Sequence, residues 1–177
     1  LLPKHGYTML VGKAKEGKTM LALSMILCLA AGVPFLTKKG DGAGFPVPEP
    51  KKTLFIRRGI LEQTVQTFLT RQKEGLEERW EKDLTKSLDL IQCFRPKATY
   101  LDIKTGLREL RSLLDEYRAD LVVMDPLSRF LTSDMNKMET AIRVANAIDE
   151  LGEEFGCAFL LLHHFRKEGK GDEAQED

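Results

Sequence analysis

Eight residues near the N-terminus have the types and the spacing that bind a polyphosphate. They read Gly12-Lys13-Ala14-Lys15-Glu16-Gly17-Lys18-Thr19 and fit the pattern GxxxxGK[ST] of the phosphate-binding P-loop. The two glycines allow a tight turn that directs backbone N–H groups at phosphate oxygens. Lys18 reaches the β- and γ-phosphates, and the Thr19 hydroxyl is a ligand for Mg²⁺. We therefore predict that this loop, together with Met20, binds ATP and Mg²⁺.

Asp125 is the best candidate for a second catalytic group. It follows the continuous apolar run Leu121-Val122-Val123-Met124, which is typical of a central parallel strand. The carboxyl ends of parallel strands share one edge of a sheet, so this carboxylate is expected near the P-loop. An acidic residue in this position fits the Walker B pattern and predicts a second contact to Mg²⁺. The alternative is an Asp that only caps the turn before Pro126.

His163 and His164 end another apolar run, which begins at Cys157. This run also predicts a strand, and its end lies at the same edge of the sheet. Adjacent strand residues point to opposite faces, so only one of the pair is expected to contact the γ-phosphate or the attacking water. Two alternatives stay open, namely a solvent-facing histidine pair and a zinc site, although further zinc ligands at suitable spacing are missing.

Strand-like and helix-like segments alternate along the chain. This order predicts an α/β fold with a mainly parallel sheet that has helices on both faces. Gly32 is expected to end the first helix, and Asp102 and Asp134 or Asn136 are expected to begin later ones. We expect strands at 7–11, 53–56, 88–94, 121–124 and 157–162, helices at 20–31, 61–73, 76–86, from 102 and from 138, and an irregular loop at 38–52.

Composition is that of an ordinary globular protein. The 177 residues are 42% hydrophobic and 31% charged, and the formal net charge is +0, so a nucleic-acid partner would need a local basic patch. No apolar run approaches the roughly 18 residues that span a bilayer. Three cysteines lie far apart in apolar segments and are expected to be buried thiols. We therefore predict a cytoplasmic protein without a membrane partner, with one domain at 1–168 and a disordered tail at 169–177, cut from a longer chain.

Three segments together resemble the RecA/DnaB-like P-loop ATPases. The segments are the P-loop with its helix, Asp125-Pro126-Leu127-Ser128-Arg129-Phe130, and His163-His164-Phe165-Arg166-Lys167. More narrowly, they are similar to the RepA-type hexameric helicases and their AAA-25 relatives, over residues 6–167. The resemblance implies a RecA-like core and ATPase activity. It also implies a DNA replication or repair motor with helicase activity, built as a homo-oligomeric ring such as a hexamer, with DNA as partner.

The resemblance also implies roles for single residues. Lys18 and Thr19 would bind phosphates and Mg²⁺, Asp125 would be the Walker B carboxylate, and His164 would be the γ-phosphate sensor, with His163 the weaker candidate. Arg166 and Lys167 would lie in a loop that reaches a neighbouring subunit or DNA. The relatives also supply an arginine finger from strands beyond the end of this chain.

One departure from the family pattern concerns catalysis. The relatives carry a Glu after the second strand that activates the attacking water, and here Arg58 or Gly59 takes that place. Glu62 comes a few residues later, so only a shifted turn would make it the base. An arginine cannot take a proton from water. The alternative to a motor is therefore a regulatory module that binds nucleotide and hydrolyses it weakly or not at all. A small-molecule kinase is disfavoured, because no Arg-rich lid segment follows.

Overall fold

Parallel pairing joins all five strands of the sheet, in the order β1-β5-β4-β2-β3. The computed structural model describes residues 5–37, 44–96, 99–135 and 137–164, and the statements below concern these residues. The strands are β1 (Gly6–Gly12), β2 (Thr53–Arg57), β3 (Ile91–Phe94), β4 (Leu121–Asp125) and β5 (Ala158–His164). This all-parallel sheet confirms the predicted α/β, RecA-like P-loop fold.

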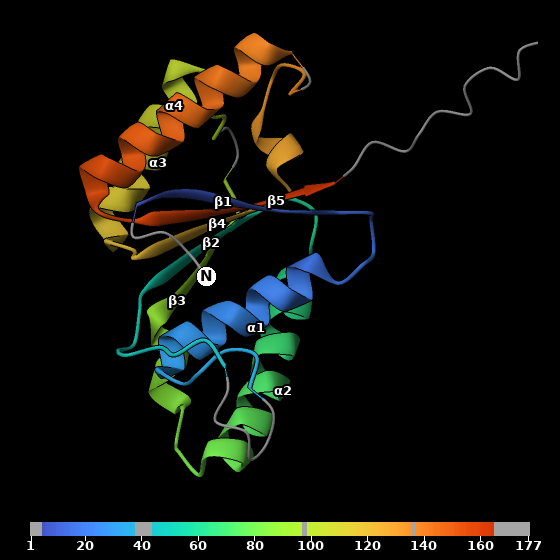
Figure 1. Ribbon diagram of the computed structural model, residues 1–177, viewed down its shortest axis with the longest axis vertical. Coiled ribbons are helices and arrows are strands. Elements are labelled where there is room, and N and C mark those ends of the chain that lie inside the picture. The colour runs from blue at the N-terminus through green and yellow to red at the C-terminus, as the bar shows by residue number, and fades with distance from the viewer. Residues whose placement is uncertain (1–4, 38–43, 97–98, 136, 165–177) are drawn as a thin grey trace, which may run out of the picture.

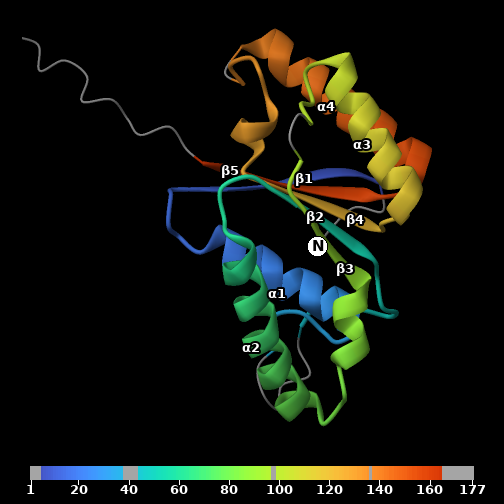
Figure 2. The same ribbon diagram turned by 180° about the vertical axis from the view of Figure 1, so that it is seen from behind.

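Helices cover both faces of the sheet (Figure 1). α1 (Lys18–Ala31) and α2 (Glu62–Trp80) lie on one face, and α3 (Lys104–Tyr117) and α4 (Met138–Phe155) lie on the other, as the reverse view also shows (Figure 2). Two 3-10 helices, η1 (Thr85–Leu90) and η2 (Leu127–Phe130), complete the described elements. Each layer of helices buries its own apolar cluster against the sheet.

β4 shows how one strand serves both clusters. Leu121 and Val123 belong to the cluster beneath α1 and α2, whereas Val122 and Met124 belong to the cluster beneath α3 and α4. Because side chains alternate along a strand, Asp125 extends the first set and is on the α1 face. The same alternation assigns His164 to the α1 face with Leu162, and His163 to the opposite face with Leu161.

The chain reverses its direction across the sheet after β3. α1 and α2 connect the strands on the way out to β3, and α3 and α4 connect them on the way back to β5. In parallel sheets the ligand crevice lies outside the carboxyl ends of the strands where such a reversal occurs. Here that edge carries the end of β1 at Gly12, the end of β4 at Asp125 and the end of β5 at His164.

The observed elements confirm most of the predicted ones. Gly32 ends α1 in the left-handed conformation, at φ 63°, and its N–H donates to the carbonyls of Cys28 and Leu29. The prediction of two helices at 61–73 and 76–86 was wrong, because α2 continues to Trp80. Gly75 costs a helix interior only about 1 kcal/mol. An ion pair from Lys73 to Glu77, at 2.7 Å, stabilises the helix across the expected break.

Asp102 is not the N-cap of α3, so that prediction was wrong. α3 begins after Ile103, and the Asp102 carboxylate instead accepts hydrogen bonds from the Thr132 N–H and hydroxyl and from the Ser133 N–H. α4 begins after Lys137 without a side-chain cap, and Asn136 lies outside the described residues. Short polar side chains can bind distant backbone N–H groups as well as local ones, so spacing alone could not place the start of α3.

Several expectations concern segments outside the described residues. These are positions 38–43 of the predicted loop, the Arg166 and Lys167 pair, and the tail at 169–177. The described part of the loop contains an antiparallel bridge between Phe35 and Phe45. The cysteines form no disulfide. Among the described residues, no helix has both the length and the apolar character needed to cross a membrane.

Candidate functional site

The P-loop connects the end of β1 directly to the start of α1. Lys15 and Gly17 have positive φ angles of 67° and 82°, which turn the chain back sharply between the strand and the helix. Gly12 lies close to the Glu16 side chain, since a Cβ built there would be 2.7 Å from Oε2 of Glu16. That same carboxylate oxygen accepts the Lys13 N–H at 2.7 Å. Local bonds therefore hold the loop in shape.

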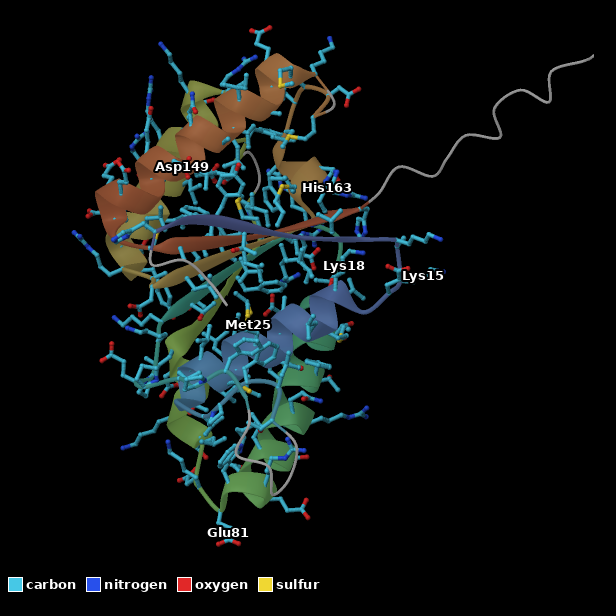
Figure 3. All side chains as sticks on the ribbon, viewed as in Figure 1. Lys15, Lys18, Met25, Glu81, Asp149 and His163 are labelled. Atoms are coloured by element: carbon cyan, nitrogen blue, oxygen red, sulfur yellow. The ribbon has the colours of Figure 1, made fainter. Side chains whose placement is uncertain are left out.

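Lys18 carries a buried positive charge at the start of α1. Its side chain is 7% exposed, and Nζ donates to the carbonyl oxygens of Gly12 at 2.9 Å and Lys13 at 2.5 Å. No carboxylate among the described residues forms an ion pair with it. Buried charges are normally paired, so this ammonium suits an anionic ligand in the loop. Figure 3 shows Lys18 at the edge of the sheet, with Lys15 farther out on the loop.

Thr19 and Asp125 come together from residues far apart in the chain. The Thr19 hydroxyl donates to Oδ2 of Asp125 at 2.5 Å, and Asp125 is 6% exposed. Burial raises the pKa of the Asp125 carboxyl, while the Thr19 hydrogen bond and the nearby His164 and Lys18 oppose this rise. A hydroxyl and a carboxylate oxygen at one point are the hard ligands that Mg²⁺ prefers. The two predicted metal-binding residues therefore fit the ion.

A polar cavity of about 400 Å³ opens beside this pair. Its walls come from α1, from the end of β2, from the Asp125–Arg129 segment and from β5. Its lining residues are Thr19, Arg58, Gly59, Ile60, Asp125, Pro126, Ser128, Arg129 and His164. The two basic residues Arg58 and Arg129 face a single acidic residue, Asp125, so the lining favours an anion.

The two histidines at the end of β5 differ in their surroundings. His164 pairs in register with Gly12 of the P-loop and lines the cavity beside Asp125. His163 lies on the other side of the sheet (Figure 3), where burial and the charges of His164 and Lys18 lower its pKa. Neither Nδ1 atom has a hydrogen-bond partner among the described residues. This arrangement agrees with the choice of His164 as the candidate phosphate sensor.

Arg58, which directly follows β2, lines the cavity, and no acidic residue of this loop does. The two residues on which a base could depend, Arg57 and Glu62, are bound to each other. Arg57 is 3% exposed and is ion-paired with Glu62, and its Nη1 donates to the Ile60 carbonyl at 2.5 Å. Glu62 also accepts from Gln66 at 3.2 Å and is not among the residues that line the cavity. Gly59 lines the cavity instead, and a Cβ built there would meet nothing within 4 Å.

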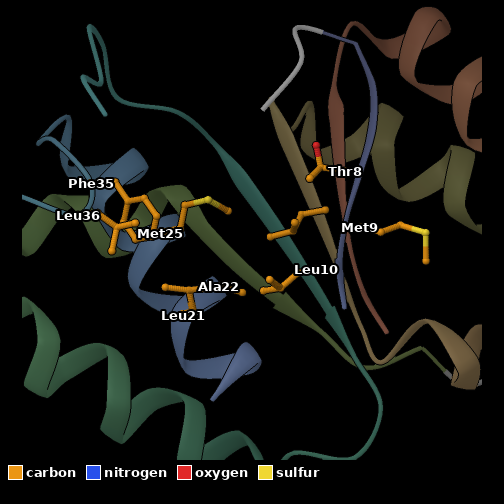
Figure 4. A pocket seen from close by; sticks show the side chains of 9 residues that line it. Thr8, Met9, Leu10, Leu21, Ala22, Met25, Phe35 and Leu36 are labelled. Atoms are coloured by element: carbon orange, nitrogen blue, oxygen red, sulfur yellow. The ribbon is translucent and has the colours of Figure 1, made fainter. Parts of the chain in front are cut away.

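Two other possibilities receive no support from the described residues. No group of three or more His, Cys, Asp or Glu side chains among them could hold a metal ion, which disfavours the zinc alternative. A second cavity, of about 190 Å³, lies between β1 and α1 (Figure 4). Leu10, Met25 and Leu36 line it, so it lacks the charges that a phosphate needs.

Nearly the whole chain matches one protein family. Residues 1–170 match the family AAA_25, which is described as an AAA domain. The chain belongs to this family. AAA_25 membership makes it a P-loop nucleotide-binding domain of the ATPase class, in agreement with the geometry of Lys18, Thr19 and Asp125. A search of curated proteins found no match. The narrower resemblance to RepA-type hexameric helicases stays a prediction.

Sequence reasoning did not predict the contacts of the Arg58 side chain. Its guanidinium lies over the rings of Tyr100, at 4.7 Å, and Phe130, at 5.2 Å, and its Nη1 donates to the Arg129 carbonyl at 2.7 Å. The two basic residues after β2 were visible in the sequence. Tyr100 offered no signal, because its contact with Arg58 depends on the pairing of distant segments.

Proposed function

We propose that this AAA_25 domain binds ATP together with Mg²⁺ and hydrolyses it slowly, so that the bound state lasts. The observation that carries the proposal is the hydrogen bond between Thr19 and Asp125, formed beside the buried Lys18 ammonium. A hydroxyl, a carboxylate and an unpaired cation meet there at the start of a helix. This is the set of groups that a P-loop needs for a metal-bound triphosphate.

Each residue of the site has a defined task in binding. The P-loop amides at the start of α1 lack intrahelical acceptors and can donate to phosphate oxygens. Lys18 would exchange the carbonyls of Gly12 and Lys13 for phosphate oxygens, and Thr19 and Asp125 would hold Mg²⁺. When bound, the metal ion neutralises charge on the phosphates. His164, which lines the cavity, would donate to the terminal phosphate or to the attacking water.

Slow hydrolysis follows from the lining of the cavity. Asp125 is the only carboxylate among the described lining residues, and it is committed to Thr19 and the metal ion. Glu62 is held by Arg57 and Gln66 outside the cavity wall. General-base catalysis typically contributes 10²- to 10⁴-fold to a rate. We therefore propose that hydrolysis by this chain lacks that contribution.

The test measures binding and turnover separately. We expect Mg²⁺-dependent ATP binding by calorimetry, weakened about 100-fold by Lys18→Ala, together with single-turnover hydrolysis that is slow. Gly59→Glu should raise the hydrolysis rate by about tenfold or more, because it adds a carboxylate to an open cavity wall. Its φ of 132° strains a side-chain residue, so folding is checked by circular dichroism. Fast hydrolysis by the natural chain would contradict the slow-turnover proposal, and absent ATP binding would contradict the whole proposal.

The DNA-motor reading remains a second candidate, because the AAA_25 match covers the segments that carry the helicase resemblance. On this reading the chain forms a homo-oligomeric ring, acts on DNA and has helicase activity. Steady-state hydrolysis with and without single-stranded DNA, and sedimentation with and without nucleotide, test these points. DNA-stimulated turnover above a Lys18→Ala blank would favour the motor over the slow nucleotide-binding module.

A further inference from the structure

Arg58 uses only a small part of its hydrogen-bonding capacity. A guanidinium has five N–H donors, yet the only hydrogen bond from this side chain to a described residue joins Nη1 to the Arg129 carbonyl. Nη2 is shielded from solvent and has no acceptor among the described residues. Arg58 lines the polar cavity beside Thr19 and Asp125, so its charge suits an anionic ligand in that cavity.

Aromatic packing fixes the guanidinium in place. Tyr100 and Phe130 lie beneath it, and the backbone of these two segments is joined by a 2.8 Å hydrogen bond from the Leu101 N–H to the Phe130 carbonyl. The segments are further tied by the Asp102 carboxylate, which binds Thr132 and Ser133. The Arg58 side chain is therefore preorganised by its packing on the two rings. A preorganised cation loses little conformational entropy when it binds an anion.

Arg58 also lies at a defined place relative to the P-loop. The cavity that it lines includes Thr19 and Asp125, which mark the metal position, and His164. Lys18 serves the β- and γ-phosphates, so the part of a nucleotide beyond Thr19 and Asp125 is its terminal phosphate. The Arg58 N–H also donates to the Asp125 carbonyl, at 2.9 Å, which fixes the start of the loop after β2 beside the metal-binding residue.

We propose that Arg58 binds the terminal phosphate of a nucleoside triphosphate and gives this site its preference for triphosphate over diphosphate. This inference rests on the proposed nucleotide-binding function and adds to it a residue that distinguishes the two nucleotides. The sequence resemblance leads us to expect a catalytic acid at this position. Arg58 instead places a fixed positive charge there. The domain recognises the triphosphate with its own arginine, from the same chain as the P-loop.

Equilibrium binding of a non-hydrolysable ATP analogue and of ADP, each with Mg²⁺, tests the proposal. Arg58→Met keeps a long, flexible side chain that can pack on the two rings and removes the N–H donors. We expect its affinity for the analogue to fall about 10- to 100-fold, the size of one charge-assisted contact, with ADP affinity changed less than about twofold. Arg108→Ala, which removes an exposed arginine on α3, is the matched control and should change neither affinity.

Other outcomes separate this inference from the function on which it rests. An equal loss for both nucleotides, or no loss, would overturn the role of Arg58 while leaving nucleotide binding intact. Failure of the natural chain to bind ADP or the analogue would overturn the proposed function itself. If Arg58→Met does not fold, Arg58→Lys takes its place. It keeps the charge and loses the fork, so we expect a loss of several-fold for the analogue alone, and equal affinities would refute the proposal.

Discussion

Two loops at the same edge of the sheet carry very different chemistry. The P-loop, residues 12–19, retains every group of its motif, and Thr19 and Asp125 are already in contact at 2.5 Å. The loop after β2, residues 57–62, brings two arginines and a glycine to the position where the sequence resemblance leads us to expect an acid. Its one carboxylate, Glu62, is paired with Arg57. Under the proposed function, the P-loop side supplies the groups that bind nucleotide, and the side after β2 lacks a free base.

This contrast shows that binding and hydrolysis depend on separable parts of one fold. Both loops follow parallel strands and reach the same cavity, so the fold alone does not decide whether the bound nucleotide reacts. Under the proposed function, the side chains that follow β2 decide it. Four substitutions test whether the two loops can be separated in this way.

Removal of the P-loop cation should have the largest effect. Lys18→Ala should weaken nucleotide binding about 100-fold, because charge-assisted hydrogen bonds contribute about 1.5–3 kcal/mol each. Isothermal calorimetry with ATP and Mg²⁺ measures this loss. Lys86→Ala is the control, since Lys86 is an exposed lysine in η1, outside the proposed site. An unchanged affinity in Lys18→Ala would remove the P-loop from the binding site.

The packing beneath Arg58 should matter mainly for stability. Asp102→Ala leaves the Thr132 and Ser133 N–H groups without their acceptor and should lower the free energy of unfolding by about 3 kcal/mol. Urea denaturation measures it, with the exposed Asp89→Ala as control. The bonds from Thr132 and Ser133 hold the pKa of Asp102 below its usual value against the opposing effect of burial. The contribution is therefore full above the ordinary carboxyl pKa and disappears as the pH falls through the lowered one. A loss that persists at lower pH would contradict this assignment.

A substitution of Asp125 tests the proposed binding of Mg²⁺ by Asp125 and Thr19. Asp125→Asn keeps an acceptor for Thr19 but removes the charge, so about tenfold more Mg²⁺ should be needed for half-maximal nucleotide binding. Metal-free binding should change less than about twofold. Asp120→Asn, at the other end of the same strand, is the matched control. Superimposable Mg²⁺ titrations of Asp125→Asn and the natural chain would reduce Asp125 to a structural role.

The pH dependence of Mg²⁺ binding sharpens the same test. Burial raises the pKa of Asp125, so acid protonates it at a higher pH than an ordinary carboxyl. The Mg²⁺ affinity of the natural chain should therefore fall on acidification, whereas that of Asp125→Asn should stay nearly constant. Parallel pH profiles for the two proteins would show that another group titrates.

The sequence predicts one of these two loops far better than the other. The P-loop and Asp125 were predictable because their motifs are local: a glycine pair before Lys18, and an acid that follows a strand. The parallel order of the strands then brings them together. The loop after β2 depends on distant partners. Neither the stacking of Arg58 on Tyr100 and Phe130 nor the role of Asp102 has a local signature, since each joins segments about 30 to 70 residues apart.

Glu62 gives the smallest expected effect and the sharpest comparison. Its side chain is 54% exposed, its carboxylate is bound by Arg57 and Gln66, and it lies outside the cavity lining. Glu62→Gln should therefore leave single-turnover hydrolysis within about twofold. It should also lower stability, because the buried Arg57 guanidinium, 3% exposed, loses its carboxylate partner.

The control for this substitution is Glu74→Gln, an exposed acid on the same helix. It should change neither rate nor stability. A fall in turnover of about 100-fold in Glu62→Gln, absent in the control, would mean that the α2 start shifts when nucleotide binds and that Glu62 acts as the base. The loop after β2 would then be catalytic, and the two halves of the site would not be separable.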